Sequence, residues 1–290
     1  MASWSDGYWG SSDGLRLHYR DYPGPEGAQE SGRPPIICIP GLTRNARDFE
    51  GVAERLSPER RVICVDLRGR GESAHAKDPM TYVPRTYVAD IEALMAELKL
   101  ERFILFGTSL GGLVTMLLSL THKERIVAAM INDIGPVIEP GGIDRIKSYV
   151  GRSQSWPTWL HAARHFSELL NEAYPKWSLD QWLVFAKRTC RLSSGGRVVL
   201  DYDMRIAEPF RVSGGDTGSD LWTAFRGLAD VPLLVVRGER SDLLTEDTLA
   251  QMQADMPLME SVTVPNVGHA PTLDEPEAQA AIDGLLSRAG

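Results

Sequence analysis

The chain has few cysteines, no long apolar run and no excess of positive charge. Its 290 residues contain three cysteines, Cys38, Cys64 and Cys190, which cannot all pair with one another. Two of them lie inside predicted strands. We therefore expect three small, buried core residues in a reducing compartment, since cysteines that form no disulfide are among the most buried residue types.

The sequence also lacks the segments that direct a protein to or across a membrane. The N-terminal stretch Met1–Asp6 shows no basic region followed by an apolar run, so no secretory signal is expected. No apolar segment reaches the roughly 20 residues that a membrane-spanning helix needs. These absences predict a cytoplasmic protein with no membrane partner.

Positive charge and metal-ligating motifs are equally scarce. The formal net charge of -8 argues against binding to nucleic acid or to an anionic membrane. The sequence contains no H-E-x-x-H, C-x-x-C or P-loop motif, and we therefore predict no metal site. With 43% hydrophobic and 24% charged residues, the composition is that of a globular protein, and the length suffices for one large α/β domain with an insertion.

Short apolar runs alternate with helical patterns along most of the sequence. A hairpin at 8–9 and 15–20 comes first. Buried strands are predicted at 35–39, 61–65, 103–106, 126–131, 231–238 and 261–264, and helices at 86–98, 113–120, 245–256 and 274–286. This alternation predicts a mostly parallel sheet with helices on both faces.

One strand leads into its helix through Gly107-Thr108-Ser109-Leu110-Gly111, a G-x-S-x-G pattern. A serine at the tip of so tight a turn must adopt strained backbone angles. Side chains two residues before and after it would clash, which Gly107 and Gly111 avoid, and Gly112 lets the helix approach the sheet. The alternative is an ordinary capping serine, which the strand and helix on either side make the weaker interpretation.

This stretch resembles the nucleophile elbow of the α/β-hydrolases. The resemblance implies the α/β-hydrolase fold, with a serine, an acid and a histidine in that order along the chain. His269, in the loop 265–271 after the last predicted strand, occupies the place of the family's histidine. Asp242, after the strand at 231–238, is the favoured acid. Glu239 in the same loop and Asp133 after the preceding strand are the alternatives.

The resemblance also implies an oxyanion hole made of backbone N–H groups. Pro40-Gly41-Leu42 stands where the family commonly has His-Gly-x, so Leu42 is one expected donor and Leu110, directly after the serine, is the other. Proline in place of histidine should cost little, because the donor is a backbone group. Arg44, just beyond this loop, is a candidate to bind a substrate carboxylate or phosphate; the alternative is a salt bridge to a neighbour such as Asp48.

Between about 136 and 218 the alternation of strands and helices stops. The position matches the family's cap insertion, which implies a hydrolase core of 1–135 and 219–290 and a helical cap of 136–218. Aromatic residues concentrate in this segment, and a cap rich in them would suit an apolar substrate group. We expect Trp156, Trp159 and Trp182 to line the pocket and most of the other aromatics to form the cap's own core.

The family resemblance implies a serine hydrolase that cleaves a carboxylic ester or a lactone through an acyl-enzyme, with no metal or organic cofactor. Epoxide hydrolases and haloalkane dehalogenases are disfavoured, because they carry aspartate where this chain has Ser109. Carbon–carbon bond hydrolases and cofactor-free haloperoxidases share the three residues and remain open. A small-molecule receptor on a hydrolase scaffold is the alternative from another class. The pattern identifies neither the substrate nor the oligomeric state.

Overall fold

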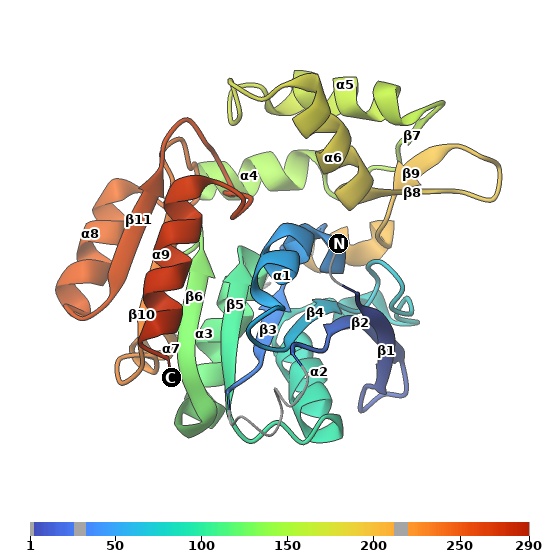
Figure 1. Ribbon diagram of the computed structural model, residues 1–290. Coiled ribbons are helices and arrows are strands. Elements are labelled where there is room, and N and C mark those ends of the chain that lie inside the picture. The colour runs from blue at the N-terminus through green and yellow to red at the C-terminus, as the bar shows by residue number, and fades with distance from the viewer. Residues whose placement is uncertain (1–2, 26–32, 212–219, 290) are drawn as a thin grey trace.

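An eight-stranded sheet forms the centre of the molecule (Figure 1). The computed structural model describes residues 3–25, 33–211 and 220–289. Across the sheet the strand order is β1-β2-β4-β3-β5-β6-β10-β11. The strands are β1 (Ser5–Gly10), β2 (Arg16–Tyr22), β3 (Ile36–Ile39), β4 (Val62–Asp66), β5 (Phe103–Thr108), β6 (Ile126–Asn132), β10 (Leu233–Gly238) and β11 (Glu260–Val264).

Most neighbouring strands run parallel, as the sequence predicts. The antiparallel pairs of this eight-stranded sheet are β1 with β2, which form the predicted hairpin, and β2 with β4. The strands β4, β3, β5, β6, β10 and β11 are parallel to their neighbours. Their carboxyl ends therefore meet at one edge of the sheet, where open α/β sheets bind their ligands.

Helices cover both faces of the sheet, and each face has its own core. Alternate residues of a strand supply the two cores: Ile37 and Ile39 of β3 belong to one, Ile36 and Cys38 to the other. The first face is covered by α2 (Pro84–Glu97), α3 (Leu110–His122), α7 (Leu221–Arg226) and α8 (Glu246–Asp255), and the second by α1 (Glu50–Leu56) and α9 (Pro276–Ser287). The predicted layered architecture is confirmed.

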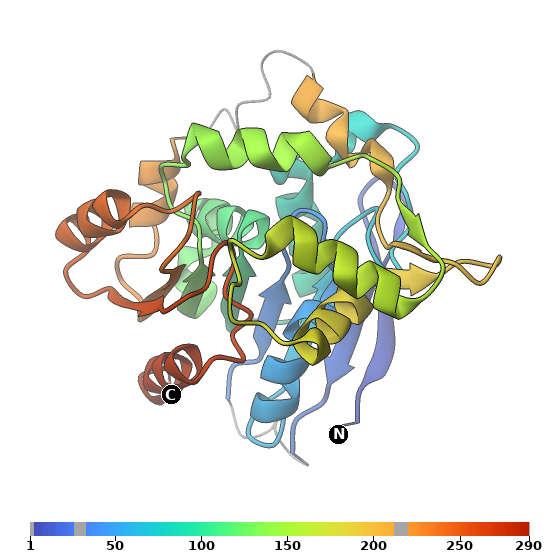
Figure 2. The same cartoon turned by 90° about the horizontal axis from the view of Figure 1, so that it is seen from above.

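Three further helices lie over the carboxyl edge of the sheet: α4 (Pro140–Tyr149), α5 (Trp159–Leu170) and α6 (Leu179–Thr189) (Figures 1 and 2). A small sheet of order β7-β9-β8 accompanies them, built from β7 (Ser155–Trp156), β8 (Cys190–Leu192) and β9 (Val198–Leu200). The sequence does not predict these strands, because two or three residues are too few to establish an alternating pattern. The expected boundary at 218/219 lies outside the described residues.

The three cysteines are free and buried, as predicted. Cys38 and Cys64 stand opposite each other in the paired strands β3 and β4. Within the described ranges 3–25, 33–211 and 220–289, every helix is too short or too polar to cross a bilayer.

Candidate active site

Ser109 stands at the turn between β5 and α3 with φ 52° and ψ -114°, a strained conformation for a residue with a side chain. The backbone packs so closely around this turn that Gly107 and Gly111 leave no room for a side chain. A Cβ at Gly107 would lie 2.5 Å from the carbonyl carbon of Gly111, and one at Gly111 would lie 2.6 Å from that of Ile39. The steric reason that the sequence suggests for the two glycines is therefore present in the structure.

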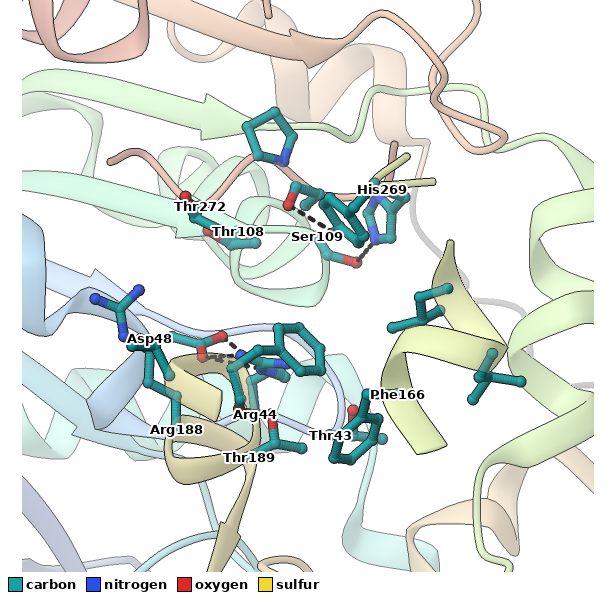
Figure 3. Close-up of a pocket in the computed structure, with 18 of the residues that line it drawn as sticks. Thr43, Arg44, Asp48, Thr108, Ser109, Phe166, Arg188, Thr189, His269 and Thr272 are labelled. Atoms are coloured by element: carbon teal, nitrogen blue, oxygen red, sulfur yellow. Dashed lines mark hydrogen bonds and ion pairs between the residues drawn. The ribbon is translucent and has the colours of Figure 1, made fainter. Parts of the chain in front are cut away.

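A chain of two hydrogen bonds connects Ser109, His269 and Asp133 (Figure 3 shows the first). His269 Nε2 lies 2.9 Å from Ser109 Oγ, and its Nδ1 lies 2.7 Å from Asp133 Oδ2. A carboxylate only accepts hydrogen bonds, so Nδ1 carries a proton. In the neutral imidazole Nε2 is then the basic nitrogen, and it faces the serine hydroxyl.

Asp133 is completely buried and its carboxylate is well satisfied. Besides His269, the backbone N–H of Gly238 donates to Oδ1 at 2.7 Å and the hydroxyl of Ser241 donates to Oδ2 at 2.7 Å. The residue takes a φ of 58° directly after β6, in the left-handed region that aspartate tolerates better than most residues. Backbone and side-chain donors thus fix the carboxylate beside the imidazole.

The favoured acid of the sequence prediction, Asp242, is not the partner of His269. Its carboxylate forms a two-pronged ion pair with Arg145 of α4, whose Nη2 donates to Oδ1 at 2.8 Å and whose Nε donates to Oδ2. Glu239 of the same loop accepts the N–H of Asn266. The structure therefore corrects the choice of Asp242: the carboxylate that forms a hydrogen bond with His269 is that of the alternative, Asp133.

Asn132 ties the histidine loop to the serine turn. Its Nδ2 donates to Thr108 Oγ1 at 3.1 Å and to the carbonyl oxygen of Pro271 at 2.8 Å. The carbonyl of Asn132 accepts the N–H of Ser109 at 2.9 Å. Sequence reasoning gave this asparagine no role, although it stands directly before Asp133 at the end of a buried strand.

The loop after β3 lies against the serine turn. A Cβ at Gly41 would lie 3.6 Å from Ser109 Cβ. The buried Arg70 holds the next residue, because its Nε donates to the carbonyl of Leu42 at 2.9 Å. Among the described residues no hydrogen bond uses the backbone N–H of Leu42 or of Leu110, and the latter begins α3, where an N–H has no partner within the helix.

A cavity of about 720 Å³ opens beside Ser109 and His269 and extends under α4, α5 and α6. Trp156 lines it, as predicted. Trp159 and Trp182 do not, which corrects their expected place: Trp182 packs edge-on against Tyr174 and Phe185 in the interior. The other aromatic side chains that line the cavity are Phe49, Tyr149, Phe166, Tyr174, Trp177, Phe185 and Tyr202.

Arg44 also lines the cavity, on the side opposite Ser109 and His269 (Figure 3). Its guanidinium stacks on Phe185 at 4.2 Å from the ring centroid, and its Nε donates to both oxygens of Asp48 at 2.9 and 2.8 Å. Burial by itself lowers the pKa of Arg44, but the charge and hydrogen bonds of Asp48 outweigh it and raise the pKa overall. The alternative of a salt bridge to Asp48 is therefore present in the structure, and binding of a substrate anion by Arg44 stays a prediction.

In the part of the chain that the structure describes, no three His, Cys, Asp or Glu side chains converge in a way that would hold a metal ion.

Comparison with known proteins identifies the family. A sequence model described as the Alpha/beta hydrolase family matches residues 36–282. The chain belongs to the alpha/beta hydrolase family. The predicted fold class is confirmed, and the protein is an enzyme of this hydrolase family.

Two hydrolases align with most of the chain. A crystal structure of an alpha/beta hydrolase from Novosphingobium aromaticivorans is 54% identical, covers 99% of both chains and superposes with a TM-score of 0.94. A 3-hydroxybutyrate-oligomer hydrolase from Cupriavidus necator is 36% identical over 256 residues, 85% of this chain and 86% of that protein. A more distant relative, 2-(acetamidomethylene)succinate hydrolase from Mesorhizobium japonicum, is 28% identical over 242 residues, 83% of this chain and 84% of that protein.

Proposed function

We propose that the protein is a serine hydrolase that cleaves carboxylic esters through an acyl-enzyme intermediate. The observation that carries the proposal is the hydrogen-bonded chain of Ser109, His269 and Asp133 at the end of the cavity. In this proposal Ser109 is the nucleophile, His269 the general base and then acid, and Asp133 the group that fixes the imidazole.

In the first half of the reaction Ser109 Oγ attacks the acyl carbon, and its proton passes to His269 Nε2. Asp133 stabilises the imidazolium that forms, because its Oδ2 accepts the Nδ1–H. The tetrahedral intermediate collapses when the bond to the alcohol oxygen breaks, and that oxygen takes the proton from Nε2. The alcohol leaves, and the acyl group remains on Ser109.

In the second half a water molecule attacks the acyl-enzyme and gives a proton to His269 Nε2. The bond to Ser109 Oγ breaks, the serine regains its proton, and the carboxylic acid leaves. The backbone N–H groups of Leu42 and Leu110 are the proposed donors to the oxyanion in both halves. Their freedom from other hydrogen bonds among the described residues supports this role.

We also propose that residues 136–218 act as a cap over this site. The support is the place of the described part of this segment, residues 136–211, above the carboxyl edge of the sheet, and the aromatic lining that it contributes to the cavity (Figure 1). Trp156, Tyr174 and Trp177 would contact an apolar acyl or alcohol group and exclude water from the acyl-enzyme.

The charges in the cavity favour an ester without a net charge near the serine. Three of the four lining arginines are paired with carboxylates: Arg44 with Asp48, Arg145 with Asp242 and Arg188 with Asp274. An oligoester of a short hydroxy acid presents uncharged ester groups along most of its length. The name of the 36% identical relative, a 3-hydroxybutyrate-oligomer hydrolase, supports this substrate class. A lactone presents the same acyl chemistry in a ring.

Cleavage of an acidic substrate, including a carbon–carbon bond next to a ketone, is the second candidate. Arg152 favours it, since this exposed arginine lines the cavity and forms no ion pair with a described residue. The 28% identical relative is named for a succinate derivative, which agrees with such a substrate. A panel that pairs each neutral oligoester with a dicarboxylic analogue separates the candidates: the ester proposal requires the higher kcat/KM on the neutral member.

Labelling with a fluorophosphonate probe tests the serine chemistry. We expect the wild-type protein to be labelled and Ser109→Ala to remain unlabelled. Ser148→Ala is the matched control, since this serine is exposed and its hydroxyl donates to the carbonyl of Arg145 in its own helix. An unlabelled wild type, or labelling that survives Ser109→Ala, would overturn the proposal. Labelling without turnover of any ester would favour the receptor alternative.

A further inference from the structure

Two carboxylates stand at the same edge of the sheet, one after each of two paired strands. Asp133 follows β6 and Asp242 lies in the loop after β10, and these strands pair in parallel. Asp133 holds His269, whereas Asp242 is turned toward α4. Both residues follow neighbouring strands, so their backbone positions are similar. The side chains that bind their carboxylates are different.

Ser241 directs its hydroxyl proton to Asp133. A serine hydroxyl has one proton to donate and two lone pairs to accept with. The N–H groups of Leu243 and Leu244 approach Ser241 Oγ at 3.3 and 3.1 Å and take up the lone pairs. The proton is left for Asp133 Oδ2 at 2.7 Å, the same oxygen that accepts from His269. The loop that carries Asp242 therefore supports the other carboxylate.

Arg145 of α4 binds both carboxylate oxygens of Asp242. Its planar fork matches the two carboxylate oxygens, a geometry that a lysine cannot reproduce. Helix α4 is fixed in this position, because Gly142 packs directly on the loop: a Cβ there would lie 2.8 Å from Leu243 Cγ. Burial raises the pKa of Asp242, but the hydrogen bonds and charge of Arg145, with a smaller contribution from the charge of His269, lower it overall.

We propose that Ser241 and Arg145 are positioning residues that select Asp133 as the partner of His269, and that Asp242 is a latent partner withheld by α4. The inference rests on the proposed function for its kinetic test and on the hydrogen bonds alone for its spectroscopic one. It makes one specific claim: if Asp133 loses its carboxylate and Arg145 releases Asp242, the latter takes the place of Asp133 on the histidine.

The test starts from Asp133→Asn, which keeps the shape of the side chain and removes its charge. We expect Asp133→Asn/Arg145→Met to recover at least about ten-fold in kcat over Asp133→Asn, since an aligned carboxylate restores the correct tautomer. Adding Asp242→Asn to this pair must abolish the gain. Asp133→Asn/Arg145→Lys is the matched control: it keeps a cation beside Asp242 and should recover less than the methionine variant.

A second readout does not need turnover. The His269 Nδ1 proton, hydrogen-bonded to a carboxylate, should give a low-field proton NMR signal in the wild type that Asp133→Asn loses. The signal should return in Asp133→Asn/Arg145→Met and vanish again with Asp242→Asn. No recovery of either rate or signal in the double variant overturns the proposal. A signal that returns in a protein without esterase activity refutes the proposed function and leaves the positioning roles intact.

Ser241→Ala tests the other half of the proposal. Ser241 contacts Asp133, which in turn contacts His269, so its effect on the reaction is indirect. We therefore expect Ser241→Ala to lower kcat about ten-fold and to change KM by less than about two-fold. Ser241→Thr, which retains a hydroxyl, should recover most of the loss. If Ser241 had a purely structural role, Ser241→Ala would lower the melting temperature without this selective loss of kcat over KM. A kcat equal to that of the wild type in Ser241→Ala would contradict the assignment.

Discussion

His269 Nδ1 lies 2.7 Å from Oδ2 of Asp133, a residue 136 positions earlier in the chain. The contact brings together the loop after the last strand and the end of β6. It also fixes the tautomer of the imidazole, because a carboxylate leaves the donor role to Nδ1. The proposed chemistry of Ser109 depends on this pair, and the predictions below test the contacts that hold the site in place.

The first prediction concerns the serine turn. A Cβ at Gly111 would overlap the backbone carbonyl of Ile39, and neither backbone can give way without shifting a strand. We expect Gly111→Ala to lower the free energy of unfolding by about 3 kcal/mol or more and to abolish activity. Urea denaturation and ester turnover measure the two effects.

Gly141→Ala is the control for this substitution. It lies in α4 with open space around the position of the new methyl group, and alanine favours a helix over glycine. Its stability should match or exceed that of the wild type. A Gly111→Ala protein as stable as Gly141→Ala would contradict the steric account of the turn.

The second prediction concerns pH and the buried histidine His18, which does not line the cavity. His18 lies between Asp66, 2.7 Å from its Nδ1, and Asp6, 2.8 Å from its Nε2, with the ring of Tyr8 beside it. Burial lowers the pKa of His18, but the two carboxylates outweigh it and raise the pKa above its ordinary 6.5. A raised pKa in the folded state stabilises the fold at low pH.

This contribution is fully present below pH 6.5, the ordinary pKa of the unfolded chain, and is lost as the pH rises through the higher pKa of the folded state. We expect the free energy of unfolding to fall more steeply between about pH 6 and about pH 9 in the wild type than in His18→Gln, which cannot titrate. Urea denaturation across this range measures the difference. Parallel curves for the two proteins would contradict the assignment of charge to His18.

The sequence predicts the features of this site that depend on a local backbone pattern better than those that depend on the direction of a side chain. Ser109 and His269 are predictable because the backbone pattern around them is local: a glycine-flanked turn after one strand, a Gly-His pair after another. The mostly parallel sheet is predictable because each apolar run and each helical pattern is also local, and their alternation favours parallel strands with helices on both faces. Where a feature depends on the direction of a side chain, the sequence alone leaves alternatives.

The choice between Asp133 and Asp242 is such a feature. Both follow buried strands, and the side chain that distinguishes them is Arg145, which lies on α4, 97 positions before Asp242. The aromatic residues of 136–218 present the same difficulty. Trp177 and Trp182 are five residues apart and touch each other, yet only Trp177 reaches the cavity. Their directions are set by tertiary packing, which no local pattern records.

The most direct test of the account compares Asp133→Asn with Asp242→Asn in the hydrolysis of a p-nitrophenyl ester. We predict that Asp133→Asn lowers kcat by about 10⁴-fold, because an asparagine favours the wrong tautomer of His269, and that Asp242→Asn lowers it by less than about ten-fold. The melting temperatures of both variants establish that they are folded. Equal losses, or a larger loss in Asp242→Asn, would contradict the central claim that Asp133 is the acid of the active site.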